Sequence, residues 1–321
     1  MDFLVLNTVA SQLRDNPSLV REIERIVPDS VRVVLTSNER STQNLLNGLG
    51  TLGVHRVYVV GGGGTFRTVL NWLMAQPTDE RPTLVPLGGG NDCLMTTHVG
   101  FSSIDPLQNI KLLFEDKVEI QEFFWRPLKV EILEEESVLY CTVFGSGLLH
   151  GFFRWIKLGH HKSRLPIFGQ ILKVAFLAFA VGKDSDGVLS QTFGDVQIDS
   201  GSIPSRSYLG LLASAVPQLP LKARPFRGKI HDGQFGSVAY WGTYRTLSLI
   251  WPFVWFGLVP PFTLGQLISK PSSRIIITTD DNHYSVDGGP VTVNCKVALI
   301  NGGVVTFVIT SGDSIMLAGP K

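Results

Sequence analysis

Two glycine-rich loops, each following a short apolar run, constrain this chain more than any other feature. They comprise Gly61, Gly62, Gly63, Gly64 and Thr65, and then Gly88, Gly89, Gly90, Asn91 and Asp92. Successive glycines let the backbone approach a ligand closely and expose its amides, and a following helix adds the positive end of its dipole. One such loop is also compatible with a plain strand-to-helix turn. The pair is more specific and predicts a single phosphate-binding crevice.

The first 86 residues alternate short β-rich apolar runs with longer segments of helical spacing. The expected strands are residues 3–7, 31–36, 57–60 and 83–87. Strands that alternate with helices predict a parallel sheet covered by helices, and ligands bind such sheets at the carboxyl ends of the strands. We therefore expect an α/β, Rossmann-like nucleotide-binding domain over residues 1–125.

The pattern changes near residue 126. Short alternating runs bounded by Gly, Asp and Pro predict an antiparallel sheet or sandwich, with expected strands at residues 127–133, 137–144, 191–198, 235–241, 274–279 and 291–297. Two helical stretches interrupt them, near 167–180 and within 246–269. We expect an all-β second domain, an antiparallel β-sandwich, over residues 126–321. Its last residues either complete it or return to the first domain.

The hydrophobic content and the net charge limit the classes of molecule that this chain could bind. Hydrophobic residues make up 44% of the chain, only 17% is charged, and the net charge is +1. A chain without a basic field is not a nucleic-acid binder, and the apolar balance favours a lipid or another apolar small molecule. The three cysteines form no CxxC pair and the N-terminus lacks a signal-peptide pattern, so we expect a cytoplasmic, reducing location. Nothing in the sequence indicates the oligomeric state.

One apolar stretch bears on membrane contact. Residues 246–269 contain no charged side chain, but Pro252, Pro260 and Pro261 interrupt them. Prolines make a straight membrane-spanning helix awkward. Three interpretations remain open: a buried helix and loop, an apolar surface in peripheral contact with a membrane, or a span.

The glycine loops resemble the GGDGT and GTGND motifs of the diacylglycerol kinase catalytic domain, which sphingosine and ceramide kinases share. Asn7 lies where that family has a first-strand asparagine, and residues 35–39 resemble its second-strand threonine segment. Later, residues 286–290 resemble its DGE motif. The resemblance implies a nucleotide domain followed by a β-sandwich lipid domain. It also implies ATP, Mg²⁺ and phosphoryl transfer to a lipid hydroxyl of the diacylglycerol or sphingoid type.

The same resemblance selects candidate site residues. Those assigned to the nucleotide are Asn7, Thr36, Gly61, Gly62, Gly63, Gly64, Thr65, Arg67, Gly88, Gly89, Gly90 and Asn91. Arg67 is either a cation for phosphate or a solvated helix residue. The catalytic candidates are Asp92, Asp287 and His150, of which Asp92 is equally suited to cap a helix. No residue is assigned as a metal ligand.

The chain departs from the family where acids are expected. The aspartate of GGDGT is Gly63 here, the glutamate of DGE is Gly289, and the helix after the first loop carries Arg67 and Thr68. A lost general base costs about 10² to 10⁴ in rate. Three functions follow: a lipid kinase with a degenerate site, an inactive pseudokinase that binds nucleotide or lipid, or a repurposed ATP-independent isomerase or cyclase acting on an apolar small molecule.

Overall fold

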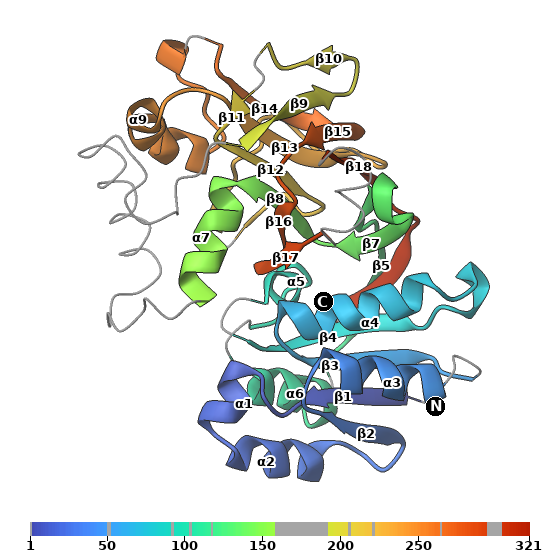
Figure 1. The fold of residues 1–321 in the computed structure, drawn as a ribbon. Coiled ribbons are helices and arrows are strands. Elements are labelled where there is room, and N and C mark those ends of the chain that lie inside the picture. The colour runs from blue at the N-terminus through green and yellow to red at the C-terminus, as the bar shows by residue number, and fades with distance from the viewer. Residues whose placement is uncertain are drawn as a thin grey trace. The chain divides into compact units, whose positions relative to one another are not determined.

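The computed structural model describes residues 2–49, 53–90, 93–102, 105–116, 118–157, 192–204, 207–219, 222–263, 265–293 and 304–321 (Figure 1). The chain divides into two compact units. Unit 1 comprises Met1–Pro127 with Asp313–Lys321, and unit 2 comprises Leu128–Gly312. The first segment of unit 1 ends close to the expected domain boundary after residue 125, and the C-terminal segment belongs to unit 1.

Unit 1 is built on a mostly parallel sheet with the strand order β2-β1-β3-β4-β19-β5. The strands are β1 (Asp2–Asn7), β2 (Val31–Thr36), β3 (Arg56–Gly61), β4 (Thr83–Gly89), β5 (Ile120–Trp125) and β19 (Ile315–Pro320). Only β5 and β19 pair in antiparallel fashion among these strands. Leu4, Val5 and Leu6 are all fully buried, as expected for a strand covered on both faces. The predicted α/β domain is confirmed.

Helices cover this sheet. They are α1 (Ser11–Asp15), α2 (Ser18–Ile26), α3 (Glu39–Leu49), α4 (Gly63–Met74), α5 (Leu94–His98) and α6 (Pro106–Phe114), with the 3₁₀ turn η1 (Thr78–Glu80). The chain runs from β1 outward to β2 and then returns past β1 to β3. Because parallel crossovers are right-handed, this reversal puts α2 and α3 on opposite faces; accordingly α3 packs beside α4, and α2 beside α6. The reversal makes the β1/β3 boundary a topological switch point, where sheets of this kind bind ligands.

Unit 2 contains two antiparallel sheets. The first has the order β10-β9-β15-β18-β6-β7, with β11 paired to β9, and the second has the order β14-β13-β12-β8-β16-β17. Their strands are β6 (Leu128–Ile132), β7 (Ser137–Cys141), β8 (Val143–Gly147), β9 (Thr192–Ile198), β10 (Gly201–Ser202), β11 (Ser207–Tyr208), β12 (Gly210–Ser214), β13 (Phe235–Tyr240), β14 (Leu267–Ser272), β15 (Arg274–Thr279), β16 (His283–Val286), β17 (Gly289–Thr292) and β18 (Val305–Ser311).

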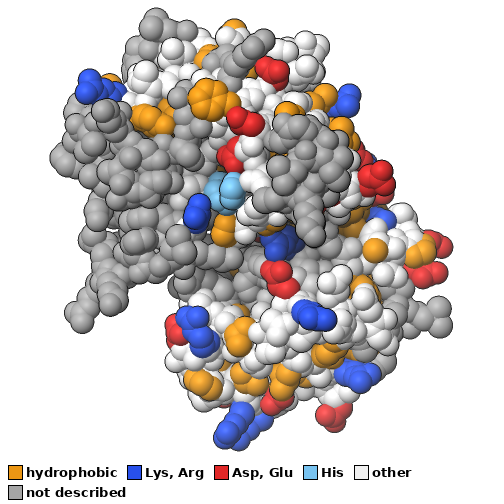
Figure 2. Space-filling view, viewed as in Figure 1, with side chains coloured by type: hydrophobic (Ala, Val, Ile, Leu, Met, Phe, Trp, Pro, Cys, Tyr) orange, Lys and Arg blue, Asp and Glu red, His pale blue; other side chains and the backbone are white. Residues whose placement is uncertain are grey.

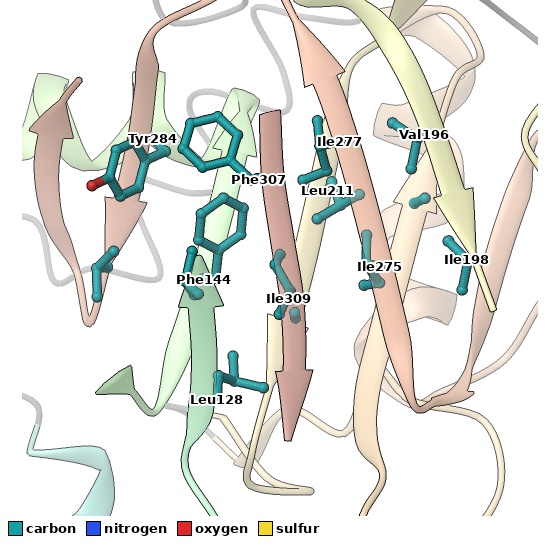
Figure 3. Packing of buried hydrophobic residues seen from close by; sticks show 14 of the residues in the cluster. Leu128, Phe144, Val196, Ile198, Leu211, Ile275, Ile277, Tyr284, Phe307 and Ile309 are labelled. Atoms are coloured by element: carbon teal, nitrogen blue, oxygen red, sulfur yellow. The ribbon is translucent and has the colours of Figure 1, made fainter. Parts of the chain in front are cut away.

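The core of unit 2 lies between these sheets. Phe144 stacks on Tyr284 with ring centroids 5.6 Å apart, and Phe307 of the opposite sheet meets Tyr284 edge-on at 5.0 Å (Figure 3). Ile275 and Ile309 are fully buried in the same cluster. Alternate residues of both sheets therefore fill one core, and the predicted β-sandwich is confirmed.

Some expected elements of unit 2 differ. The expected strand at residues 291–297 begins earlier, as β17, and residues 294–303 lie outside the described part, as does the helix expected at 167–180. The described helices of unit 2 are α7 (Leu148–Lys157) and α9 (Tyr244–Trp255), with the 3₁₀ turns η2 (Leu133–Glu135) and η4 (Pro261–Thr263).

The apolar stretch at residues 246–269 is divided in the structure. Its described residues form α9, then η4, then the start of β14. Pro252 lies inside α9. Among the described residues, no helix combines the length and the apolar character needed to cross a bilayer.

Candidate functional site

The two glycine loops meet at one edge of the unit 1 sheet. We call residues 61–65 and 88–90 the glycine edge. The strands β3 and β4 are parallel neighbours with Gly61 opposite Gly89, so their carboxyl ends bring both loops together. Asn7, at the end of β1, and Thr36, at the end of β2, are register partners on the same edge.

Glycine is required where the loops touch. A Cβ atom on Gly90 would lie 2.6 Å from the Cα of Gly62, and one on Gly89 would lie 3.2 Å from the amide nitrogen of Gly61. Gly88 and Gly89 also have φ values of 82° and 118°, which residues with a side chain rarely adopt. The backbones of the two loops are therefore packed directly on each other, and this explains why glycines occupy both.

The first turn of α4 presents its amides at this edge. Gly62 is the N-cap residue, with φ −86° and ψ −176°, and no side chain caps the helix. The unpaired amides of a helix N-terminus, together with the helix dipole, bind anions such as phosphate. The geometry of the glycine edge thus fits a phosphate group.

A side-chain hydrogen bond joins β1 to this turn. The Asn7 amide nitrogen donates to the Thr65 hydroxyl oxygen at 2.7 Å, while the Asn7 amide oxygen accepts from the backbone N–H of Val9 at 3.1 Å. Thr65 is buried and close to Gly61, where a Cβ would lie 2.6 Å from the threonine side chain. Because Thr65 accepts from Asn7, its own hydroxyl proton can be donated to a phosphate oxygen.

Arg67 is engaged in an ion pair. Its Nη2 lies 2.8 Å from Oε1 of Glu39, the first residue of α3, and only 15% of the Arg67 side chain is exposed. It is therefore not a solvated helix residue. The same Glu39 oxygen would lie 3.0 Å from a Cβ on Gly64. The Glu39 carboxylate thus reaches the first turn of α4. The sequence did not select Glu39 as a site residue. The available signal was its position just after β2, a strand that ends on the ligand-binding edge.

Thr36 is buried beside Asn7. Its carbonyl oxygen accepts from both the backbone N–H and the hydroxyl of Thr8, at 2.9 and 3.1 Å. Its own hydroxyl oxygen has no hydrogen-bond partner within the described part of the chain. Asn91 and Asp92, which complete the second loop in sequence, lie outside the described residues.

The Asp287 side chain, in unit 2, accepts hydrogen bonds from the backbone. One carboxylate oxygen accepts from the backbone N–H groups of Thr142 and Val143, each at 2.9 Å, and the Asp287 N–H donates to the Val143 carbonyl. Its φ of 49° places it in the tight turn between β16 and β17. These contacts fasten that turn to the start of β8.

His150, on α7 in unit 2, is 7% exposed. Its Nδ1 lies 2.8 Å from the Tyr284 carbonyl oxygen, which can only accept, so Nδ1 carries the proton and Nε2 has a free lone pair. Burial lowers the pKa of His150, which favours the neutral ring. Nε2 is buried and has no partner among the described residues. Such a nitrogen can accept a proton from a ligand hydroxyl.

A second histidine lies next to this ring. The centroids of His150 and His283 are 5.3 Å apart, and Nδ1 of His283 lies 3.0 Å from a carboxylate oxygen of Asp281. The described residues nevertheless contain no group of three or more His, Cys, Asp or Glu side chains arranged to hold a metal ion.

Comparison with known proteins accounts for the glycine edge. Residues 3–122 match the diacylglycerol kinase catalytic domain. Most of unit 1 is therefore similar in sequence to that domain. The matched residues include both glycine loops of this chain and the strands β3 and β4, which carry them. A search of curated proteins finds no match.

Solved structures extend the likeness to the whole fold. Two crystal structures from Bacillus anthracis str. Sterne, both of proteins assigned as diacylglycerol kinases, align over 98% of this chain and 96% of their own. Their TM-scores are 0.65 and 0.62, with 15% and 14% sequence identity. At this identity the likeness establishes the fold alone: an α/β domain followed by a β-sandwich.

The described residues fit the phosphates of ATP better than they fit Mg²⁺. The glycine edge suits nucleotide phosphates. Mg²⁺ prefers carboxylate oxygens, but the positions where the motifs have acids hold Gly63 and Gly289. Among the described contacts, Glu39 is the one carboxylate at the first turn of α4, and it pairs with Arg67. The described part of the site therefore does not form a magnesium site.

Proposed function

We propose that this protein binds the phosphates of ATP at the glycine edge and transfers phosphate to a lipid hydroxyl of the diacylglycerol or sphingoid type. The observation that carries the proposal is the direct backbone contact between Gly62 and Gly90 beneath the uncapped first turn of α4. That contact leaves no room for a side chain at Gly90, and the first turn of α4 leaves helix amides for an anion.

The position of the edge supports a nucleotide rather than a simple anion. It lies at the β1/β3 switch point, where doubly wound sheets bind nucleotides. Asn7 orients the Thr65 hydroxyl there. Within unit 2, His150 is the candidate base, because its Nδ1 carries the proton and its Nε2 has a lone pair with no partner among the described residues.

We expect the transfer to be slow. Phosphoryl transfer depends on positioning and on charges that stabilise the transferring group, and the acids expected at positions 63 and 289 are both glycine. A lost base lowers rates by about 10² to 10⁴. His150, Asp287 and Asp92 remain the candidates for a compensating role.

A second candidate is a pseudokinase that binds nucleotide without transferring phosphate. Two observations favour it. Arg67 is neutralised by Glu39, and Asp287 is engaged with two backbone amides. Arg67 and one carboxylate oxygen of Asp287 are thus occupied within the protein.

The test measures binding and transfer separately. Binding of labelled ATP is compared between the native protein, Gly90→Ala, which pushes a Cβ into Gly62, and Gly48→Ala, which has nothing within 4 Å of the added atom. Transfer of label to a mixed lipid extract is then compared between the native protein and Gly63→Asp. We expect ATP binding that Gly90→Ala weakens and Gly48→Ala preserves, with label transfer increased by Gly63→Asp.

Each outcome selects one function. Binding without transfer by the native protein supports the pseudokinase. Absence of ATP binding in every form overturns the proposal and leaves the ATP-independent isomerase or cyclase acting on an apolar small molecule.

A further inference from the structure

Large apolar side chains are exposed on and just after α9. Leu249 is 54% exposed, Phe253 42%, Phe256 70% and Leu258 55%. Leu249, Phe253 and Phe256 follow a spacing of four and three residues, which places them on one side of a helix. Four such side chains in ten residues form a patch, not the scattered single exposures that are normal for a protein surface.

The opposite side of α9 is also apolar, but it is packed. Ile250 is fully buried, and Leu247 and Val254 lie against the same cluster with Leu209, Val238 and Leu267 of the underlying sheet region. A surface helix normally has polar residues on its outer side. Because α9 is apolar on both sides, its outer side is suited to an apolar environment.

A basic segment meets the end of α9. Lys222, Arg224, Arg227 and Lys229 are all exposed, and no acidic residue occurs between residues 222 and 231. The Arg224 N–H donates to the Trp255 carbonyl at 2.8 Å, so this basic segment lies against the C-terminal end of α9. No ion pair within the described part of the chain joins these four cations to a carboxylate. In Figure 2, hydrophobic and cationic side chains reach the surface close together in the region of α9.

We infer that this surface, formed by Leu249, Phe253, Phe256 and Leu258 with the cations Lys222, Arg224, Arg227 and Lys229, docks on a lipid bilayer that contains anionic lipids. We call it the α9 surface. Its apolar side chains enter the interfacial region, and its cations meet the anionic headgroups. The inference goes beyond nucleotide binding and lipid phosphorylation, and it does not depend on them.

The charge pattern decides among possible occupants. A second copy docked by two-fold symmetry would bury the cations of both copies in one interface, and the α9 surface offers no carboxylate to pair with them. An anionic bilayer instead complements both the apolar patch and its rim. The helix lies on the bilayer and does not cross it, because its 12 residues span about 18 Å against a hydrocarbon core of about 30 Å.

The experiment is sedimentation of the full chain with vesicles. Vesicles of phosphatidylcholine alone are compared with vesicles of phosphatidylcholine mixed with phosphatidylserine. We expect binding to the mixed vesicles that weakens as salt is added. The double variant Phe253→Ser, Phe256→Ser and the double variant Arg227→Glu, Lys229→Glu should each weaken it by about tenfold or more.

Matched controls come from unit 1. Phe124→Ser removes an aromatic side chain that is 73% exposed, and Arg21→Glu with Arg25→Glu reverses two exposed cations of α2. Both controls should bind vesicles like the native protein. Because the substituted side chains are exposed, thermal unfolding should stay close to native in every variant.

Two results would overturn the inference. One is equal vesicle binding by the native protein and the double phenylalanine variant. The other is absence of binding to mixed vesicles together with a concentration-dependent dimer that Phe253→Ser, Phe256→Ser abolishes, because the α9 surface would then be an interface between copies.

Discussion

The Asn7 side-chain amide donates a 2.7 Å hydrogen bond to the Thr65 hydroxyl, and so ties the end of β1 to the first turn of α4. The two residues are 58 positions apart in the chain. Their contact spans the switch point of the sheet. The effect of replacing Thr65 depends on this hydrogen bond.

Replacing Thr65 tests this bond directly. Thr65→Val keeps the shape of the side chain but leaves the Asn7 amide without its acceptor, so we expect a loss of about 1 to 2 kcal/mol in the free energy of unfolding. ATP affinity should fall as well. Chemical denaturation and nucleotide titration measure the two effects. Thr65→Ser, which keeps the hydroxyl, should stay close to native; equal losses in both variants would contradict the role of the hydroxyl.

Gly90→Ala should destabilise unit 1. The added Cβ would lie 2.6 Å from the Gly62 Cα, and backbone atoms on both sides cannot yield without shifting a loop, so we expect a cost of about 1 to 3 kcal/mol. Gly48→Ala, in α3 with open space around the added atom, should instead stabilise by about 0.5 to 1 kcal/mol. Thermal unfolding of both variants checks the contrast. A Gly90→Ala protein as stable as the native one would show that the loops separate easily.

Glu39→Gln should tighten anion binding at the glycine edge. The Glu39 carboxylate pairs with Arg67 and lies near Gly64, so removing its charge raises the positive potential at the first turn of α4. A gain of about two- to tenfold in ATP affinity is expected from one unit charge at this range. Arg67→Met should act in the opposite direction. Glu24→Gln, on α2, is the control, and a gain of the same size there would show a general charge effect.

Stability should depend on the pH through His150. Burial lowers the pKa of His150 in the folded protein, so below about pH 6.5 the unfolded chain binds a proton that the folded protein resists. The free energy of unfolding should therefore fall as the pH drops from about 7 toward 5. His150→Asn retains a donor for the Tyr284 carbonyl and removes the titrating ring, so its pH dependence should be weaker.

His98 contributes in the same direction, because burial also lowers its pKa. The comparison is therefore between variants, with denaturation curves at both ends of this pH range. Should His150→Asn and the native protein lose the same stability on acidification, His150 would not be a source of the dependence.

Much of the fold could be predicted because its signals are local. The buried β1 reads as a run of apolar residues, and the alternating runs of unit 2 match strands such as β9 and β15. Period-two and period-3.6 patterns reflect which side chains face a core, and that information is carried by neighbouring residues. The apolar run at 246–269 remained ambiguous, because hydropathy alone does not separate the buried side of α9 from its exposed side.

The sequence by itself determined the two glycine loops and the alternation of strands and helices that carries them, since both signals lie in neighbouring residues. Only the tertiary structure decided that Glu39 neutralises Arg67 and that Asp287 holds a turn. It also decided that the His150 Nε2 is buried. These outcomes depend on residues far apart in the chain, and a charged side chain takes its role from whatever the folded chain places within a few ångströms of it.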